Sequence, residues 1–143
     1  MKNMGKLLLC IIIGLLLVYV CISVISSIWL RHIVVSCNIS DTQSNGLLQH
    51  FSDESLMKKL DYRNDALHLT QNPSFDIQVS FPLFLVRFGH AQARFYVTWN
   101  GYEELLGQRT HRVGVYKQPV DVCLQWENGK WVITNITRHE FIK

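Results

Sequence analysis

The side chains best suited to chemistry are spread thinly along these 143 residues. Six histidines occur at positions 32, 50, 68, 90, 111 and 139, and no two are spaced four residues apart as in a helical metal site. We therefore predict no metal and no cofactor. Asp121 falls on a mixed face of the predicted sheet, where burial would raise its pKa and suit it to proton transfer. An exposed carboxylate at the start of a strand is the simpler interpretation.

The four cysteines fall into two pairs with different surroundings. Cys10 and Cys21 lie in a long apolar run, where a thiol behaves as a small apolar group. Cys37 and Cys123 lie in the rest of the chain and can form a disulfide if that part lies outside the cytoplasm. Spacing alone does not establish the geometry that a disulfide needs, so free thiols are the alternative.

Two triplets, Asn38-Ile39-Ser40 and Asn135-Ile136-Thr137, match the N-glycosylation pattern, which matters only in a eukaryotic secretory pathway.

A second class of candidates would bind a ligand rather than react with it. Ligand pockets favour aromatic rings beside a few polar groups. A groove over the predicted sheet would be lined by Tyr96, Trp99, Asp121, Gln125 and Thr134. Packing in the core explains most of the aromatic rings more simply.

Residues Leu7 to Leu30 form one uncharged apolar run, LLLCIIIGLLLVYVCISVISSIWL. A helix rises about 1.5 Å per residue, so this run can cross a hydrocarbon core of roughly 30 Å. Because lipid offers no partners to backbone groups, the run should be a transmembrane helix. A cleavable signal peptide is the alternative, although Ser26-Ser27 followed by Ile28-Trp29-Leu30 is a poor cleavage site.

The charges beside this run predict its orientation in a cell membrane. Lys2 and Lys6 precede it and only Arg31 follows closely, which favours a cytoplasmic N-terminus and a C-terminal domain outside. Arg31 to Val35 can either prolong the helix or begin the domain. We therefore divide the chain into a cytoplasmic segment 1–6, a transmembrane helix 7–30, a juxtamembrane connection 31–46 and an extracytoplasmic domain 47–143.

The balance of charge argues against a nucleic-acid partner. The chain has 14 Lys and Arg against 11 Asp and Glu, and Lys2 and Lys6 supply most of its net charge of +3. A nucleic-acid-binding domain should show a clustered basic face, and this sequence has none. The partners we expect are the lipid bilayer and another membrane or envelope protein.

The domain sequence changes from helical to strand-like periodicity. A short helix is predicted after Phe51, with Ser52 as its N-cap and with Leu56 and Leu60 on its buried face. Alternating apolar residues then predict strands. These strands cover 75–81, 91–99 and 112–116, with Pro82 and Asn100-Gly101 ending the first two and a polar connection over 103–110.

The sharpest local signal lies near the end of the chain. Two strand-like runs, 120–127 and 130–137, are joined by Asn128-Gly129, a dipeptide that favours a type I′ hairpin turn. The turn predicts a register and a core face. In that register Trp126 opposes Trp131, Val122 opposes Asn135, and both tryptophans lie in the core.

These elements predict an α+β fold. A transmembrane helix is followed by one or two short helices and a curved antiparallel sheet of four to five strands. The order of elements and the Asn-Gly-Lys-Trp turn at 128–131 resemble the nuclear transport factor 2-like superfamily of cone-shaped domains. The resemblance covers Phe75 to Arg138. Family members with one N-terminal membrane helix include bacterial type IV secretion and conjugation assembly factors and Gram-positive surface proteins, and the resemblance implies a role in assembly.

Three functions are compatible with this pattern. The leading hypothesis is a non-enzymatic, single-pass membrane protein that displays an interaction domain in a cell-envelope assembly. The alternative is a membrane-anchored domain that binds a small apolar ligand in the sheet groove, and the third is a cone-type enzyme. A filled core with an exposed apolar edge would favour assembly. An apolar pocket would favour the ligand binder, and a deep pocket with a buried carboxylate would favour the enzyme.

Overall fold

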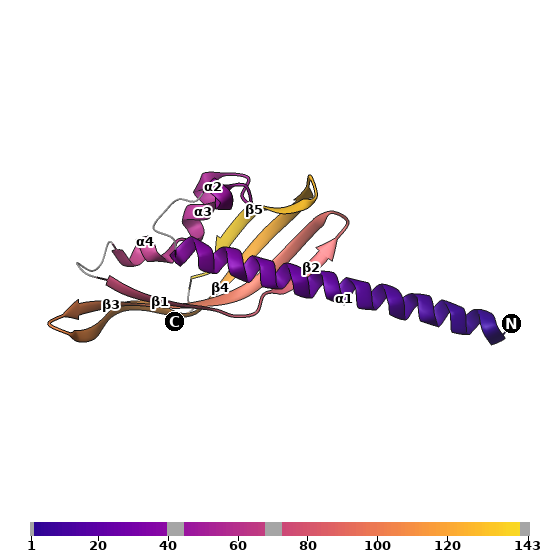
Figure 1. The fold of residues 1–143 in the computed structure, drawn as a ribbon, viewed down its shortest axis with the longest axis horizontal. Coiled ribbons are helices and arrows are strands. Elements are labelled where there is room, and N and C mark those ends of the chain that lie inside the picture. The colour runs from indigo at the N-terminus through magenta and orange to yellow at the C-terminus, as the bar shows by residue number, and fades with distance from the viewer. Residues whose placement is uncertain (1, 40–44, 68–72, 141–143) are drawn as a thin grey trace.

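The computed structural model describes residues 2–39, 45–67 and 73–140 and has an α+β fold (Figure 1). In the described part, four helices precede five strands. These elements are α1 (Lys2–Ile39), α2 (Asn45–Leu48), α3 (Glu54–Leu60), α4 (Tyr62–Leu67), β1 (Pro73–Val79), β2 (Leu83–Arg87), β3 (His90–Leu105), β4 (Gln108–Glu127) and β5 (Lys130–Arg138). They form one antiparallel sheet, in which β1 and β2 both pair with β3 and the order continues through β4 to β5. The predicted fold class is confirmed.

The apolar run continues into the domain as part of one unbroken helix, α1. Figure 1 shows the N-terminal part of α1 projecting beyond the sheet. From Ser26 onward one side of the helix is buried, and Leu30, Val34 and Asn38 are each at most 3 % exposed. The expected connection over 31–46 is therefore helical as far as Ile39 and packed as far as Asn38, while 40–44 lie outside the described residues. Among the described helices, α1 alone is long and apolar enough to span a membrane.

The short helix α3 begins one residue later than predicted, because Asp53 rather than Ser52 caps it. The Asp53 Oδ1 atom accepts a hydrogen bond from the Ser55 N–H at 3.0 Å. This bond is the main reason that the pKa of Asp53 is lowered, since the charged carboxylate is the better acceptor. Leu56 and Leu60 are buried, as the sequence predicts.

Strands β3 and β4 form a longer hairpin than the sequence predicts. The expected polar connection over 103–110 is instead paired strand, closed by a tight turn at Leu106 and Gly107. Asn100-Gly101 does not end a strand but lies inside β3, next to shifts in its pairing with β4. An Asn-Gly dipeptide is compatible with a β-bulge as well as with a turn. Here the residues on both sides of it pair with β4, so the strand continues.

The β4–β5 hairpin turns at Asn128 and Gly129, which have φ values of 49° and 81°. Trp126 pairs with Trp131, as predicted. Their rings meet edge to face with centroids 5.0 Å apart. Trp126 is nevertheless half exposed rather than in the core, because it lies at the tip of the hairpin beyond the packed layer.

A bulge in this hairpin changes the predicted register further from the turn. The pairing shifts by one residue between Cys123 and Leu124, so Val122 opposes Ile136 and not Asn135. The side chain of Ile136 is consequently turned toward the core and is 3 % exposed. A pattern read from the turn alone cannot include this extra residue, because a bulge changes which side chains face the core.

The inner face of the sheet and α1 together form a filled core. Leu30, Ile33 and Val34 of α1 belong to the same buried cluster as alternate residues of the strands, among them Phe84, Phe95, Val97, Val120, Val122, Leu124 and Ile133. Helices α3 and α4 add Leu56, Leu60 and Tyr62 to this cluster. The helix α1 thus covers the inner face of the sheet and fills the space beside it.

Candidate functional site on the outer sheet face

The outer face of the sheet carries an apolar patch at its β2 side. The outer-face patch consists of Phe81, Leu83, Leu85 and Tyr96, which are 56, 67, 52 and 45 % exposed. Strand β2 is apolar on both faces, since the alternate residue Phe84 is buried in the core. A strand that meets water on one face usually places polar residues there, so this patch is a candidate contact for a partner.

The two long edges of the sheet differ in their cover. Residues 50–52 lie along β5, where the Ile133 N–H donates to the His50 carbonyl oxygen at 2.8 Å and the Ser52 N–H donates to the Ile133 carbonyl oxygen at 2.9 Å. On the opposite side, β2 has only β3 as a neighbour among the described strands. The helix α1 reaches this side as well, where the Tyr19 hydroxyl accepts from the Val86 N–H at 3.3 Å. A strand without a neighbouring strand on one side can pair with another chain, so the patch lies beside the edge better suited to association.

A shallow hollow of about 370 Å³ continues from the patch over β3 and β4. At its floor, the Nε and Nη2 atoms of Arg94 donate to the two carboxylate oxygens of Asp121 at 2.6 and 2.7 Å. The His139 Nε2 atom lies 2.7 Å from Asp121 Oδ2. These contacts, the one with Arg94 first, hold the pKa of Asp121 at about 2. A general base needs a raised pKa, whereas these contacts lower the pKa of Asp121.

The residues suggested to line one groove are divided between the two faces of the sheet. Trp99 is 4 % exposed in the core, whereas Tyr96 and Gln125 are exposed on the outer face. Tyr96 and Trp99 are three residues apart, and an odd spacing places strand residues on opposite faces. Asp121 lies on the outer face, and Thr134 is half-buried and donates its hydroxyl to the Cys123 carbonyl oxygen at 3.2 Å.

The thiols of Cys37 and Cys123 are both free. Cys37 lies on α1 beside the core, and burial raises its pKa to about 12. Cys123 lines the hollow on the outer face, so the two thiols are on opposite sides of the sheet. Within the part of the chain that the structure describes, no three His, Cys, Asp or Glu residues are grouped as a metal site, and His68 lies outside that part.

Asn38 joins α1 to the short helices through its side-chain amide. Its Nδ2 donates to the carbonyl oxygens of Val34 and Leu60, each at 2.8 Å. Its Oδ1 accepts from the backbone N–H groups of Tyr62 at 2.8 Å and Arg63 at 3.3 Å. The sequence singled out Asn38 only as a glycosylation acceptor, but in the fold it is 3 % exposed and fully occupied.

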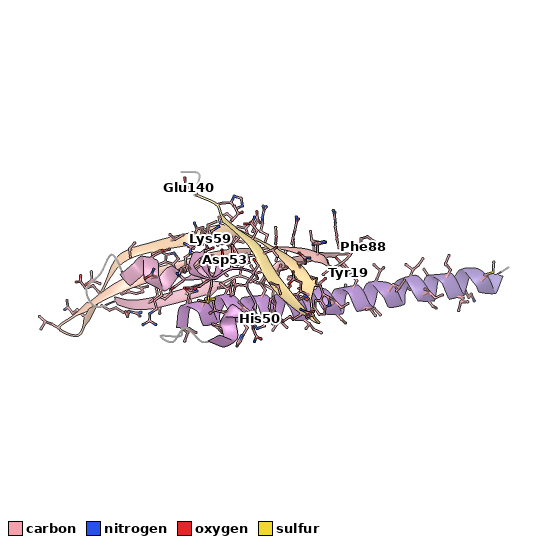
Figure 2. The ribbon with its side chains drawn as sticks, turned by 90° about the horizontal axis from the view of Figure 1, so that it is seen from above. Tyr19, His50, Asp53, Lys59, Phe88 and Glu140 are labelled. Carbon is pink, nitrogen blue, oxygen red and sulfur yellow. The ribbon has the colours of Figure 1, made fainter. Side chains whose placement is uncertain are left out.

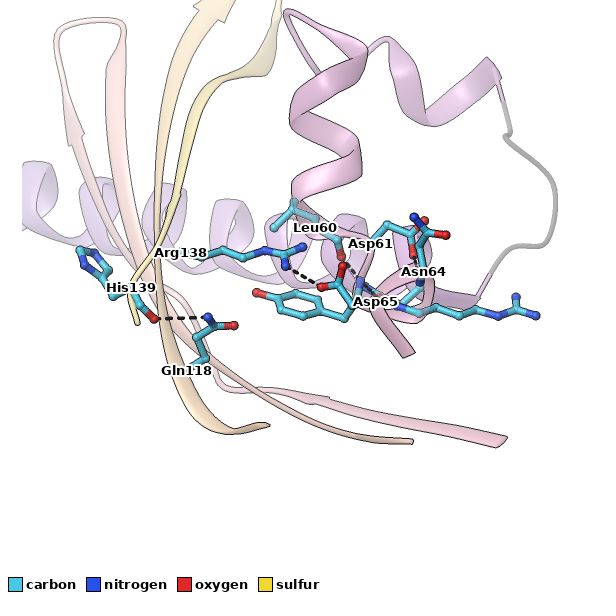
Figure 3. Close-up of polar contacts among 10 residues, drawn as sticks. Leu60, Asp61, Asn64, Asp65, Gln118, Arg138 and His139 are labelled. Carbon is cyan, nitrogen blue, oxygen red and sulfur yellow. Dashed lines mark hydrogen bonds and ion pairs between the residues drawn. The ribbon is translucent and has the colours of Figure 1, made fainter. Parts of the chain in front are cut away.

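Figure 3 shows how the end of β5 is tied to α4. The Arg138 Nη1 atom donates to Asp65 Oδ2 at 2.8 Å, and its guanidinium lies 4.0 Å from the centre of the Tyr62 ring. Tyr62 is fully buried, which raises its pKa to about 12. Gln118 Nε2 also donates to the His139 carbonyl oxygen at 3.3 Å. The contacts of Arg138 therefore tie the end of β5 to α4.

A second hollow, here called the anchor groove, lies between α1 and the tips of two hairpins. Its volume is about 610 Å³. Trp131 Nε1 donates to the buried Ser26 hydroxyl at 3.1 Å, and the Trp126 N–H donates to the Gly89 carbonyl oxygen at 2.7 Å, which joins the two tips. The groove is lined by Ile22, Ile25, Ser26, Trp29, Val86, Gly89, Trp126, Gly129, Lys130 and Trp131.

The sequence indicated Ser26 only as part of a poor cleavage site and Gly89 only as a possible turn. The serine is small, which lets the indole of Trp131 lie directly against the helix. A polar, small pair inside a long apolar run is the signal that would have located this contact. Comparisons with known protein families, with curated proteins and with solved structures each find no match.

Proposed function

We propose that this chain is a single-pass membrane protein, without catalysis, whose α+β domain binds another protein of a cell-envelope assembly. The outer-face patch above a filled core is the observation that carries this proposal. Because α1 already covers the inner face, Leu83 and Leu85 are not part of the chain's own core. Removal of these exposed apolar side chains from water by a partner is favourable, and β2 has no second strand beside it.

The anchor of this proposal is α1. Its side chains between Met4 and Ile22 are exposed and largely apolar, which suits a helix surrounded by lipid. Lys2 and Lys6 precede the apolar run and Arg31 follows it, which favours a cytoplasmic N-terminus and a domain outside the cytoplasm. The helices before the sheet and the turn at 128–131 support a nuclear transport factor 2-like domain, as in membrane-anchored assembly factors.

The proposal is tested by replacing Leu83 and Leu85 with threonine in the full chain. Both side chains are exposed and threonine suits a strand, so the free energy of unfolding should change by less than about 1 kcal/mol. Cross-linking in intact cells, followed by purification from solubilised membranes, should recover a specific protein with the unmodified chain and far less with the double variant.

The matched control is Leu106→Asn, which alters an even more exposed leucine at the opposite tip of the sheet and suits its positive φ. Recovery of the partner should be unchanged in this variant. Equal recovery with the Leu83→Thr, Leu85→Thr variant would refute the outer-face patch as the binding surface. Failure of the unmodified chain to recover any protein would refute the assembly role.

A second candidate function, the binding of a small apolar ligand, is supported by the anchor groove. The groove is apolar and of ligand size, but it lies beside α1 and not inside the sheet. Native mass spectrometry of the purified chain tests this function. A bound apolar molecule that is lost in Ile25→Trp, which fills the groove, would support it, and a chain free of ligand would contradict it.

A further inference from the structure

The hairpin tips beside the anchor groove lie level with the apolar run of α1. The Val86 N–H donates to the Tyr19 hydroxyl at 3.3 Å, which fixes β2 against the middle of the run. Gly89 and Gly129, each in a hairpin turn, line the groove together with Ile22 and Ile25. Figure 2 labels Phe88 and Tyr19 at the end of the domain nearest the projecting helix.

The length of a membrane span determines where this part of the helix must lie. A bilayer core needs about 20 helical residues, and any such stretch within Leu7–Leu30 includes Tyr19, Ile22 and Ile25. Protein that contacts these residues cannot stand clear of the bilayer while α1 crosses it. We infer that the tips of the β2–β3 and β4–β5 hairpins dock into the leaflet of the membrane on the side of the domain, from the headgroup layer inward. The inference rests on the proposed membrane anchor.

The side chains at the two tips have the chemistry of a membrane interface. Phe88 is 105 % exposed and Trp126 is 50 % exposed, and aromatic rings are favoured at the depth of the lipid headgroups. Arg87 precedes Phe88 in the chain, and Lys130 lines the anchor groove together with Trp126. Long cationic side chains at these positions can reach lipid phosphates. An anionic or zwitterionic phospholipid is therefore the partner that these tips fit.

The backbone of the β2–β3 turn gives independent support. Phe88 has a φ of 36° and Gly89 a φ of 80°, as in a two-residue type I′ turn. The first position of this turn favours Asn, Asp or Gly, and a bulky residue is disfavoured in the left-handed region. Phenylalanine is unsuited to the turn and makes no use of its ring in the fold, which fits a contact outside the protein.

The anchor groove also fits this depth. It is apolar and open beside Ile22 and Ile25, so lipid acyl chains would enter it where α1 leaves the bilayer. The bond from the Val86 N–H to Tyr19 satisfies a backbone donor at the edge of the sheet, which matters where little water is present. The domain therefore rests on the membrane at three points: the helix and the two tips.

The test places the photo-cross-linker p-benzoylphenylalanine at single positions of the full chain in nanodiscs of phosphatidylcholine and phosphatidylglycerol. Position 16 reports on the span, position 88 on the docked tip and position 106 on the far end of the sheet. Leu106 is the matched control, because it too has a positive φ, of 52°, and is fully exposed at 104 %, like Phe88. We expect lipid adducts at positions 16 and 88 and none at 106.

The outcomes separate the inference from the proposed anchor. Adducts at 16 without adducts at 88 would refute docking and leave the anchor intact. Absence of lipid adducts at 16 would refute the anchor itself. Equal adducts at 88 and 106 would refute a specific orientation of the domain on the bilayer.

A second measurement tests the role of the ring. With the cross-linker at position 126, Phe88→Asn should lower the yield of lipid adducts by about tenfold, because burying one phenylalanine shifts such an equilibrium by that order. Asparagine suits the turn, so the fold is kept. Leu106→Asn should leave the yield unchanged, and an unchanged yield in Phe88→Asn would refute the contribution of Phe88.

Discussion

Replacement of Asn38 by alanine should break the joint between α1 and the domain. The change removes two donors and one acceptor from a residue that is 3 % exposed. The Leu60 carbonyl and the Tyr62 N–H, which belong to fully buried residues, would lose their partner in the amide. Each unpaired buried backbone group costs about 1–3 kcal/mol, so we expect the two groups together to lower the free energy of unfolding by about 2–6 kcal/mol.

The measurement is thermal or urea unfolding of the full chain in detergent micelles, followed by tryptophan fluorescence. The signal follows the domain because Trp99 and Trp131 are buried in its core. A loss near the middle of the expected range would lower the unfolding temperature by more than about 10 °C in a domain of this size.

Two variants make the result specific. Asn135→Ala removes the amide of an exposed asparagine and should change the free energy of unfolding by less than about 0.5 kcal/mol. Asn38→Asp keeps the acceptor but places a carboxylate against the carbonyls of Val34 and Leu60. Burial raises the pKa of such a carboxyl above its unfolded value, so this variant should gain stability as pH falls. A loss below about 1 kcal/mol in Asn38→Ala would refute the reasoning.

Three further predictions concern other parts of the fold. Ser26→Leu should lower the free energy of unfolding by about 1–3 kcal/mol, since the larger side chain meets the Trp131 indole, and urea titration measures the loss. In intact cells, a membrane-impermeant maleimide should label Cys123 but not Cys37, whose thiol is buried with a raised pKa, and labelling only after lysis would contradict an external domain. The Asp121 pKa of about 2 lies below its usual value, so the stability from its contacts with Arg94 and His139 is present above about pH 4 and is lost as pH falls toward 2. The free energy of unfolding of Asp121→Asn, measured over the same pH range, should not show this loss. The loss is below about 1 kcal/mol for a pair at the surface.

Most elements of the fold could be predicted because their signals are local. A few neighbouring residues are enough to recognise each signal: the turn at Asn128-Gly129, the apolar face of α3, and the alternation in β1 and β3. The turn at Leu106-Gly107 was not predicted, since leucine is atypical at that position and long-range pairing of β3 with β4 imposes it.

The joint of the anchor and the domain could not be predicted for a different reason. The buried side of α1 repeats at Ser26, Leu30, Ile33 and Val34, a helical spacing that is hidden where nearly every neighbour is apolar. The bonds of Asn38 reach residues 22 to 25 positions away, beyond any local pattern. The patch on β2 could be recognised as apolar, but a strand that is apolar on both faces gives no sign of which face is buried.

Because α1 is one continuous helix, the direction in which the outer-face patch points depends on the number of residues in the helix. Each residue added between Leu7 and Ile25 would turn the domain by about 100° about the helix axis and move it by about 1.5 Å. If neighbouring proteins bind α1 inside the bilayer, the number of helical residues between their contact and the domain determines the direction in which the patch faces. Insertion of seven residues, about two turns, would bring the patch back to its original direction, whereas insertion of two would turn the patch away from its partner. A flexible tether would show no such periodicity.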